Sequence, residues 1–263
     1  MRADKFFAEK FGSRTKSAEA IEKGLGLVDG KAIRPKDEVL GTEKIVFVTA
    51  EENFVSNGGY KLSRALKEFS FSCQNMVFVD IGASTGGFTD CLLQNGAKKV
   101  FAVDVGESLL HKSLQDDSRI VRMENTNARY LSKESFPEKI DGIVMDVSFI
   151  SIRLILPAIA EILLENSFAF LLIKPQFECE KKNIGKSGIV HPSAHPDIVN
   201  KILIACAEHH LNACGIINAP IRKGKNIEYV LLVKKGHVST CNHNAIVEKI
   251  KFLIKNYSLG ILQ

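Results

Sequence analysis

The sequence lacks the features that mark membrane, secreted and zinc-binding proteins. Its longest apolar runs, such as 168–173 and 229–233, fall far short of the roughly 20 residues that span a bilayer. The six cysteines form neither a CxxC pair nor a zinc-ligand spacing, which excludes disulfide scaffolds and zinc ribbons. The opening residues, MRADKFFAEK, carry charges where a signal peptide is apolar. We therefore expect a cytoplasmic protein with buried free thiols, no membrane segment and no metal.

The overall composition is that of a globular protein. Of the 263 residues, 45% are hydrophobic and 25% are charged, proportions that exclude a disordered or low-complexity chain. The formal net charge of +5 favours an anionic partner but does not identify one.

Two blocks with different patterns follow one another. Residues 1–45 predict a small α+β module, in which Ser13 caps a helix and Asp29 lies in a hairpin turn. Residues 46–56 are expected to form a linker. Residues 57–236 alternate apolar strands (76–81, 100–105, 120–123, 142–147 and 168–173) with helices (88–94, 107–114, 154–164 and 196–210).

This alternation predicts an α/β fold with a mostly parallel sheet covered on both faces. The last two strands, 215–220 and 228–233, are joined by a loop too short for a crossover helix, so we expect an antiparallel pair at the end of the sheet. The sheet would then have seven strands, and 237–263 would form a helical tail.

A glycine-rich loop follows the first strand of the predicted sheet, in V-F-V-D-I-G-A-S-T-G-G-F (77–88). Its spacing matches neither G-x-G-x-x-G nor G-x-x-x-x-G-K, which disfavours a dinucleotide or a triphosphate. Asp104 ends the next strand, where a carboxylate can accept hydrogen bonds from both hydroxyls of a ribose. Because the loop has no Lys or Arg and Asp80 precedes it, S-adenosylmethionine is favoured, with Asp80 near its amino group. A tight turn that binds no ligand is the alternative.

Charged residues occur where apolar strands begin or end. Asp146 and Lys174 follow strands, Glu228 begins one, and Lys61 starts a helix just before the sheet. Such charges are costly to bury unless they are paired or functional. Next to a methyl donor they suggest 2′-hydroxyl methylation, with Lys174 as general base and Lys61 as a neighbouring cation that favours its neutral form. Ordinary ion pairs that cap strands are the alternative.

Five motifs resemble, in order, those of the TlyA family. They are D-I-G-A-S-T-G-G-F-T-D, A-V-D-V-G, D-V-S-F-I-S, K-P-Q-F-E and G-K-N-I-E-Y. This family joins an S4 RNA-binding domain to an FtsJ-like (RrmJ-like) methyltransferase domain. The resemblance implies a Rossmann-like class I fold and S-adenosylmethionine-dependent 2′-O-methylation of cytidine in ribosomal RNA. The family's Lys-Asp-Lys-Glu tetrad falls on Lys61, Asp146, Lys174 and Glu228, and an adenine-side contact falls on Asn127.

The expected cofactor-binding residues lie in or just before the loop and at the ends of the second, third and fourth strands. They are Asp80, Gly82, Ala83, Ser84, Thr85, Gly86, Gly87, Phe88, Asp104, Val105, Asn127 and Asp146. The expected contacts to ribosomal RNA or ribosomal subunits are basic side chains in the first block and near the proposed active site. They are Arg2, Lys5, Arg14, Lys16, Lys31, Lys182, Arg222, Lys223 and Lys225.

Three alternatives compete with this interpretation, one within the enzymes and two from other classes of protein. A methyltransferase that attacks a base often carries an Asn/Asp-Pro-Pro-aromatic strand end, whereas this chain has D-V-S-F (146–149), which favours ribose. A non-catalytic S4-anchored assembly factor would not need the tetrad. The haemolysin label that some members carry is disfavoured by the absence of a lytic or membrane-spanning stretch.

Overall fold

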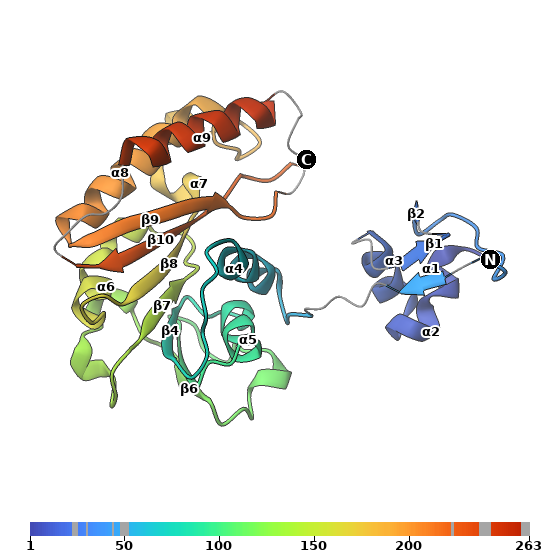
Figure 1. Cartoon of the computed structure of the whole chain (residues 1–263), viewed down its shortest axis with the longest axis horizontal. Helices are drawn as coiled ribbons and strands as arrows, with labels where there is room; N and C mark the ends of the chain where they lie inside the picture. Colours follow the sequence, from blue (N-terminus) through green and yellow to red (C-terminus); the bar gives the residue numbers. More distant parts are fainter. Residues whose placement is uncertain are drawn as a thin grey trace. The chain divides into compact units, whose positions relative to one another are not determined.

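The computed structural model of the chain describes residues 1–22, 26–29, 31–43, 45–47, 53–221, 224–236 and 243–258. The chain divides into two compact units, Met1–Asn53 and Phe54–Gln263 (Figure 1). Each unit has its own hydrophobic core, and each is described by itself below.

The first unit packs three short helices beside a three-stranded antiparallel sheet of order β2-β1-β3. Ser13 caps the third helix as predicted, since its hydroxyl accepts a 3.2 Å hydrogen bond from the Lys16 backbone N–H. The predicted hairpin is also present, with Asp29 at a φ of 50° in the turn. Ala3, Phe7, Ile21 and Val39 form the small core. The elements are α1 (Ala3–Phe6), α2 (Ala8–Phe11), α3 (Arg14–Glu22), β1 (Gly26–Val28), β2 (Lys31–Ala32) and β3 (Ile45–Phe47).

The second unit is built on a seven-stranded sheet of order β6-β5-β4-β7-β8-β10-β9. The first five of these strands are mutually parallel, and β10 runs antiparallel to both β8 and β9, as the sequence predicted. The strands are β4 (Val77–Ile81), β5 (Lys99–Val103), β6 (Ile120–Met123), β7 (Gly142–Met145), β8 (Phe168–Ile173), β9 (Leu211–Asn218) and β10 (Tyr229–Lys235).

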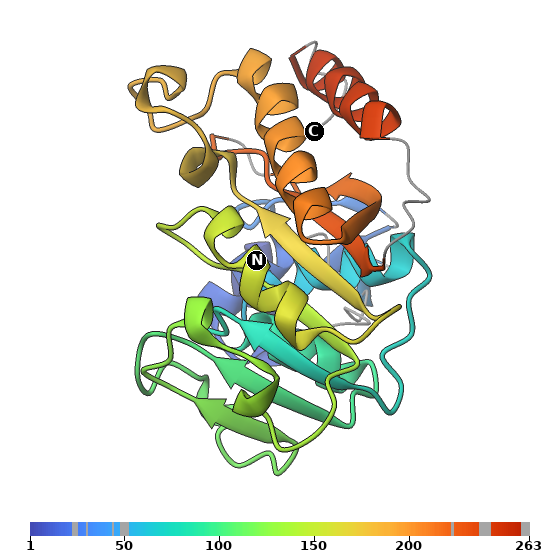
Figure 2. The same ribbon diagram turned by 90° about the vertical axis from the view of Figure 1, so that its left-hand side faces the viewer.

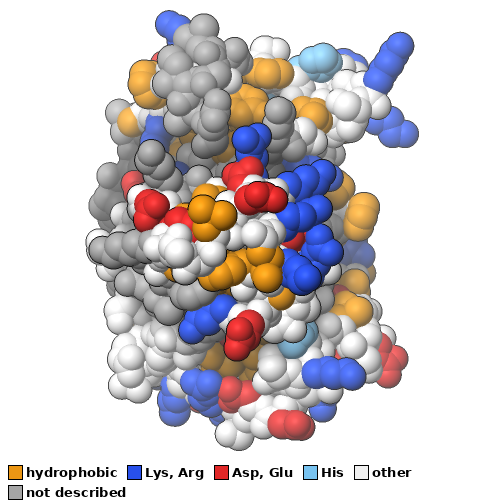
Figure 3. Space-filling view, turned by 90° about the vertical axis from the view of Figure 1, so that its right-hand side faces the viewer, with side chains coloured by type: hydrophobic (Ala, Val, Ile, Leu, Met, Phe, Trp, Pro, Cys, Tyr) orange, Lys and Arg blue, Asp and Glu red, His pale blue; other side chains and the backbone are white. Residues whose placement is uncertain are grey.

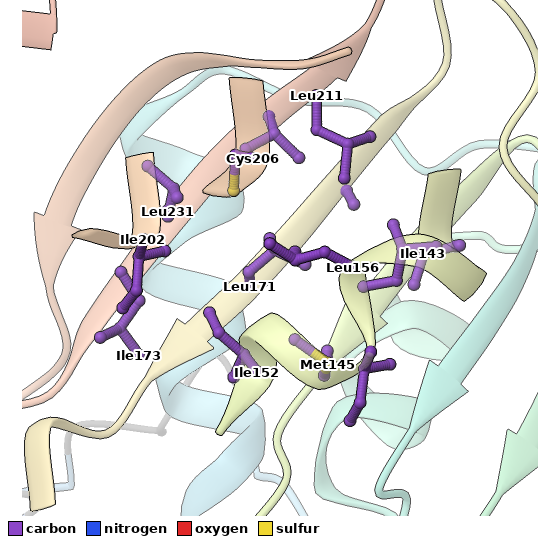
Figure 4. Close-up of a cluster of buried hydrophobic side chains, with 14 of the residues drawn as sticks. Ile143, Met145, Ile152, Leu156, Leu171, Ile173, Ile202, Cys206, Leu211 and Leu231 are labelled. Carbon is purple, nitrogen blue, oxygen red and sulfur yellow. The ribbon is translucent and has the colours of Figure 1, made fainter. Parts of the chain in front are cut away.

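Helices cover both faces of this sheet (Figure 2). Successive strand residues point to opposite faces, so each strand contributes to two cores. Helices α4 (Asn57–Glu68) and α5 (Gly87–Gln94) pack on one face against residues such as Phe78 and Phe170. The other face carries α6 (Leu156–Ile162), α8 (His195–Glu208) and α9 (His243–Ser258). Figure 4 shows part of that larger core, including Met145, Leu171 and Cys206.

Two details differ from the sequence-based expectations, and a third concerns the tail, whose role the sequence left open. The helix predicted over 107–114 is wrong: only a short 3₁₀ turn, Lys112–Leu114, forms there, because Ser108 has a left-handed φ of 54° that a helix does not allow. Cys214 is exposed, whereas Cys73, Cys91 and Cys206 are buried. The tail helix α9 packs against α8 and buries Ile250 and Leu253, so it is part of the second unit.

Candidate active site

Four charged side chains meet at one edge of the seven-stranded sheet. Asp146 directly follows β7 and Lys174 directly follows β8. Glu228 directly precedes β10, which runs the other way, and Tyr229 lies opposite Ile173 in the sheet. The end of one strand and the beginning of the next therefore reach the same edge. Lys61 comes from the second turn of α4, whose first turn is capped by Ser56 through a 3.3 Å hydrogen bond from the Gly58 N–H.

These four residues form one ion-pair network. Lys174 Nζ lies 2.5 Å from Asp146 Oδ1 and donates to Ser148 Oγ at 2.8 Å. Lys61 Nζ lies 2.7 Å from Glu228 Oε2 and 3.7 Å from Asp146 Oδ2. The side chains are 11–19% exposed, so the network is largely shielded from water but remains open on one side. Ser148 was not among the predicted residues, although it lies in the same D-V-S-F motif.

The glycine loop and two of the tetrad residues, Asp146 and Lys174, line a common cavity. Its walls come from the loop (Gly82, Ala83, Ser84, Thr85, Gly87, Phe88), from the start of α4 (Ser56, Gly58) and from the tetrad region (Asp146, Ser148, Lys174). Gly82 has a φ of 81°, and a Cβ there would lie 2.7 Å from the Asp146 carbonyl oxygen. Only glycine lets the loop approach the strand end this closely.

Asp104 lies in an adjoining hollow with Ala83, Ser84, Leu109 and Leu110. Its carboxylate accepts hydrogen bonds from the backbone N–H groups of Ser84 (2.9 Å) and Gly106 (2.8 Å), so it is fixed against the glycine loop. Leu109, which lines the hollow, is 44% exposed; Val105 directly follows Asp104 and is 69% exposed, but it is not among the residues that line the hollow. The hollow therefore combines a positioned acceptor with uncovered apolar surface.

Asp80 lies behind the loop and does not line the cavity. It is fully buried, Thr89 Oγ1 donates a 2.6 Å hydrogen bond to its Oδ2, and its Oδ1 has no hydrogen-bond partner among the described residues. Burial raises the pKa of this carboxyl to about 7, the Thr89 hydrogen bond opposes the rise, and the negative charges of Asp146 and Asp104 add to it. Asp80 thus supports the loop from beneath.

Two further predicted residues have local roles. Gly86 has a φ of 88° and packs against Leu110 and Leu114. Asn127 caps the 3₁₀ turn Ala128–Tyr130, because its side-chain oxygen accepts from the Arg129 backbone N–H at 3.1 Å. Neither residue lines the two hollows.

Phe149 projects from the loop after β7 in an unusual backbone conformation. It is 91% exposed with a φ of 65°, and its ring centroid lies 5.1 Å from that of Phe177. Glu178 fixes the next turn by accepting hydrogen bonds from the Ile152 N–H (2.7 Å) and Ser151 Oγ (2.6 Å). A bulky residue with positive φ is strained, so this exposed ring is held in place at an energetic cost.

The predicted RNA-binding side chains lie in both units. Arg2 and Arg14 both pair with Asp4, at 2.8 Å and 3.0 Å, and remain about half exposed. Lys5, Lys16, Lys182 and Lys225 are exposed, and Lys182 pairs with Glu180. The side chain of Lys31 and the residues Arg222 and Lys223 lie outside what the structure describes. Figure 3 shows basic side chains gathered beside acidic ones, a mixed-charge surface.

Metal-binding and membrane-spanning features were also sought in the described part of the chain. No group of three or more His, Cys, Asp or Glu side chains there could hold a metal ion. None of the helices described is long and apolar enough to cross a membrane.

The sheet order, the glycine loop after β4 and the acidic residue after β5 define a Rossmann-like methyltransferase. Residues 54–235 match the family of FtsJ-like methyltransferases, and the chain belongs to this family. It is 37% identical over 226 residues to the 16S/23S rRNA (cytidine-2′-O)-methyltransferase TlyA of Mycobacterium tuberculosis, covering 84% of each chain.

Two solved structures are similar in fold. One, from Streptococcus thermophilus and described as a hemolysin, is 33% identical, covers 98% of each chain and has a TM-score of 0.72. An S-adenosylmethionine-dependent methyltransferase of Listeria monocytogenes covers 68% of this chain and 98% of its own, with a TM-score of 0.53. Its identity of 11% makes this second likeness one of fold alone.

Proposed function

We propose that this methyltransferase transfers a methyl group from S-adenosylmethionine to the 2′-hydroxyl of a cytidine in ribosomal RNA. The observation that carries the proposal is the network of Lys61, Asp146, Lys174 and Glu228 at the mouth of the glycine-loop cavity. The printed name of the Mycobacterium relative supports the choice of cytidine and of ribosomal RNA. Such a substrate would place the activity where ribosomes are assembled, in the cytoplasm.

The residues present fit S-adenosylmethionine. A ribose can donate its hydroxyls to Asp104, which retains lone pairs beyond its two backbone hydrogen bonds. Val105 and Leu109 offer apolar surface to a purine beside that carboxylate. The glycine loop brings backbone close to the ligand, and when bound the cofactor supplies a methyl group on a positively charged sulfur. Asp146, which lines the cavity, is the carboxylate nearest to that charge in this proposal.

The tetrad residues would orient the 2′-hydroxyl and accept its proton. Lys174, as the general base, takes the proton from the hydroxyl as the new O–C bond forms and the S–C bond breaks. Asp146 holds Lys174 Nζ at 2.5 Å, and Ser148 fixes the same nitrogen from another side. Lys61 is held between Asp146 and Glu228 and is the adjacent cation. Glu228, which pairs with Lys61 Nζ at 2.7 Å, would hold that cation beside the target ribose.

The first unit would deliver the RNA. We propose that the first unit is an S4-like RNA-binding domain, which the sequence placed at residues 1–45, and that the linker placed at 46–56 begins within β3 (Ile45–Phe47) of its sheet. Arg2, Lys5, Arg14 and Lys16 are the described candidates for phosphate contacts there. Lys182 and Lys225 are candidates near the catalytic edge of the sheet.

The test uses purified protein, labelled S-adenosylmethionine and ribosomal subunits from a strain that lacks this gene. Wild type is expected to label rRNA at an alkali-resistant linkage, because alkaline cleavage requires a free 2′-hydroxyl. Lys174→Ala should lose at least 100-fold in transfer rate, the order expected for a general base, while it still binds the cofactor. Lys98→Ala, an exposed lysine at the opposite edge of the sheet, is the matched control.

Two outcomes would contradict the proposal. Label at an alkali-sensitive linkage would indicate methylation of a base. Cofactor binding without transfer to either subunit or to naked rRNA would favour a non-catalytic assembly factor.

A further inference from the structure

A second hollow is lined by the other two tetrad residues, Lys61 and Glu228. It is lined by Lys61, Gln176, Pro220, Lys225, Asn226 and Glu228. It contains two tetrad residues but none of the residues that line the glycine-loop cavity. A nucleotide that offers its 2′-hydroxyl to the tetrad, with the methyl donor in the glycine-loop cavity, would place its remaining atoms in this hollow.

The two amide side chains in this hollow differ in their hydrogen bonding. Asn226 is fully engaged with the loop that precedes α8, since its Oδ1 accepts from the Val190 N–H at 2.8 Å and its Nδ2 donates to the Gly188 carbonyl at 3.0 Å. Gln176 is not engaged in this way. Its Oε1 is buried and has no hydrogen-bond partner among the described residues. A buried acceptor without a partner is unfavourable, so this atom is suited to a ligand that brings a donor.

The position of Gln176 is fixed by the catalytic strand. It is the second residue of α7 (Pro175–Glu178), which begins directly after Lys174. Pro175 sets the backbone at the first helical position, so the amide follows the proposed base by two residues. Gln176 therefore moves with Lys174 and has a defined position relative to the reacting hydroxyl.

The donors of a nucleotide limit what Gln176 can bind. A cytidine inside an RNA chain has two kinds of hydrogen-bond donor, the 2′-hydroxyl and the exocyclic amino group. The 2′-hydroxyl is used by the tetrad, which leaves the amino group for Oε1. A uridine would present a carbonyl oxygen at the same place, which is also an acceptor. Lys225 brings an ammonium donor to the same hollow, which suits the ring nitrogen and carbonyl oxygen of cytosine.

We propose that Gln176 is a specificity-determining residue that accepts a hydrogen bond from the exocyclic amino group of the target cytosine. This inference rests on the proposed function, because it requires a nucleotide whose ribose is at the tetrad. It makes the hollow lined by Gln176 and Lys225 a base-reading site, distinct from the cofactor cavity.

The test compares ribosomal subunits that carry cytidine or uridine at the position labelled by the wild type. Gln176→Leu keeps the size of the side chain but cannot accept a hydrogen bond, and it should lower the cytidine rate about tenfold while leaving the uridine rate unchanged. Gln176→Glu offers two acceptor oxygens and should retain the preference for cytidine. Gln74→Leu, at the amino-terminal side of β4, is the matched control. Cofactor affinity should be the same in all four proteins.

The failures can be told apart. If wild type transfers no methyl group, the proposed function fails, and this inference fails with it. If wild type transfers methyl groups but Gln176→Leu keeps the wild-type ratio of cytidine to uridine rates, only this inference is overturned. A labelled nucleotide other than cytidine would overturn it as well.

Discussion

Replacing Gly87 with alanine should test how closely the glycine loop and α4 are coupled. Gly87 begins α5, and a Cβ at this position would lie 2.1 Å from Ser56 Oγ, 3.0 Å from the Gly59 nitrogen and 3.1 Å from Gly58 Cα. All three atoms belong to the start of α4, which carries Lys61. The added methyl group would therefore push α4 away from the loop.

The cost can be worked out from these contacts. Ser56 can rotate away, but its capping hydrogen bond to the Gly58 N–H is then lost, at about 1 kcal/mol. The backbone atoms can separate only if the helix shifts, and overpacking of this kind costs about 1–3 kcal/mol. Alanine recovers up to about 1 kcal/mol of helix propensity. The net expectation is a loss of about 2 kcal/mol in the free energy of unfolding.

Urea unfolding followed by circular dichroism measures this loss. Gly58→Ala is the matched stability control, because a Cβ there has only ordinary contacts of 3.4–3.5 Å, and it should be neutral or stabilising by up to about 1 kcal/mol. The shift of α4 should also displace Lys61 from its 2.7 Å contact with Glu228 and lower methyl transfer about tenfold.

The double variant Ser56→Ala/Gly87→Ala distinguishes the clash from a general effect. Removing the hydroxyl relieves the shortest contact, so the double variant should lose less stability than the sum of the two single variants. Additivity within about 0.5 kcal/mol, or a Gly87→Ala protein as stable as wild type, would refute the reasoning.

Two further predictions concern strain and burial around the site. Phe149→Gly should raise the free energy of unfolding by about 1 kcal/mol, because glycine relieves the strain of a φ of 65°. The same variant should raise the KM for ribosomal subunits several-fold, because it removes an exposed ring on which a base can stack. Unchanged stability would contradict the strain. Asp80 has a folded-state pKa of about 7 against an ordinary 3.8, so the unfolded chain loses this proton first and stability falls as pH rises between these values. Asp80→Asn can still accept the hydrogen bond from Thr89. Its free energy of unfolding, measured with urea, should equal that of wild type at pH 4 and exceed it by roughly 2–4 kcal/mol at pH 8. An equal difference at both pH values would show that protonation is not the cause.

Much of the fold was predictable because its signals are local. Near-continuous apolar strands such as 168–173 predict a buried parallel sheet. The short loop before Glu228 predicts that the last two strands, β9 and β10, pair antiparallel. The helix expected over 107–114 failed, since helical spacing of apolar residues does not reveal that Ser108 adopts a left-handed conformation. Leu110 and Leu114 still pack under the glycine loop, Leu110 from the bend and Leu114 from the short 3₁₀ turn that follows it.

The sequence alone determined which residue types stand at strand ends, and hence that Asp146, Lys174 and Glu228 reach one edge of a sheet. That follows from chain direction, because parallel strands end on the side where an antiparallel neighbour begins. Only the tertiary structure decided the pairing within the group. Lys174 contacts Asp146 and Ser148, and Lys61 bridges to Glu228, because α4 packs beside α5 and against β10. The unpartnered oxygen of Gln176 and the burial of Asp80 behind the loop were likewise decided by packing between segments distant in sequence, which no local pattern records.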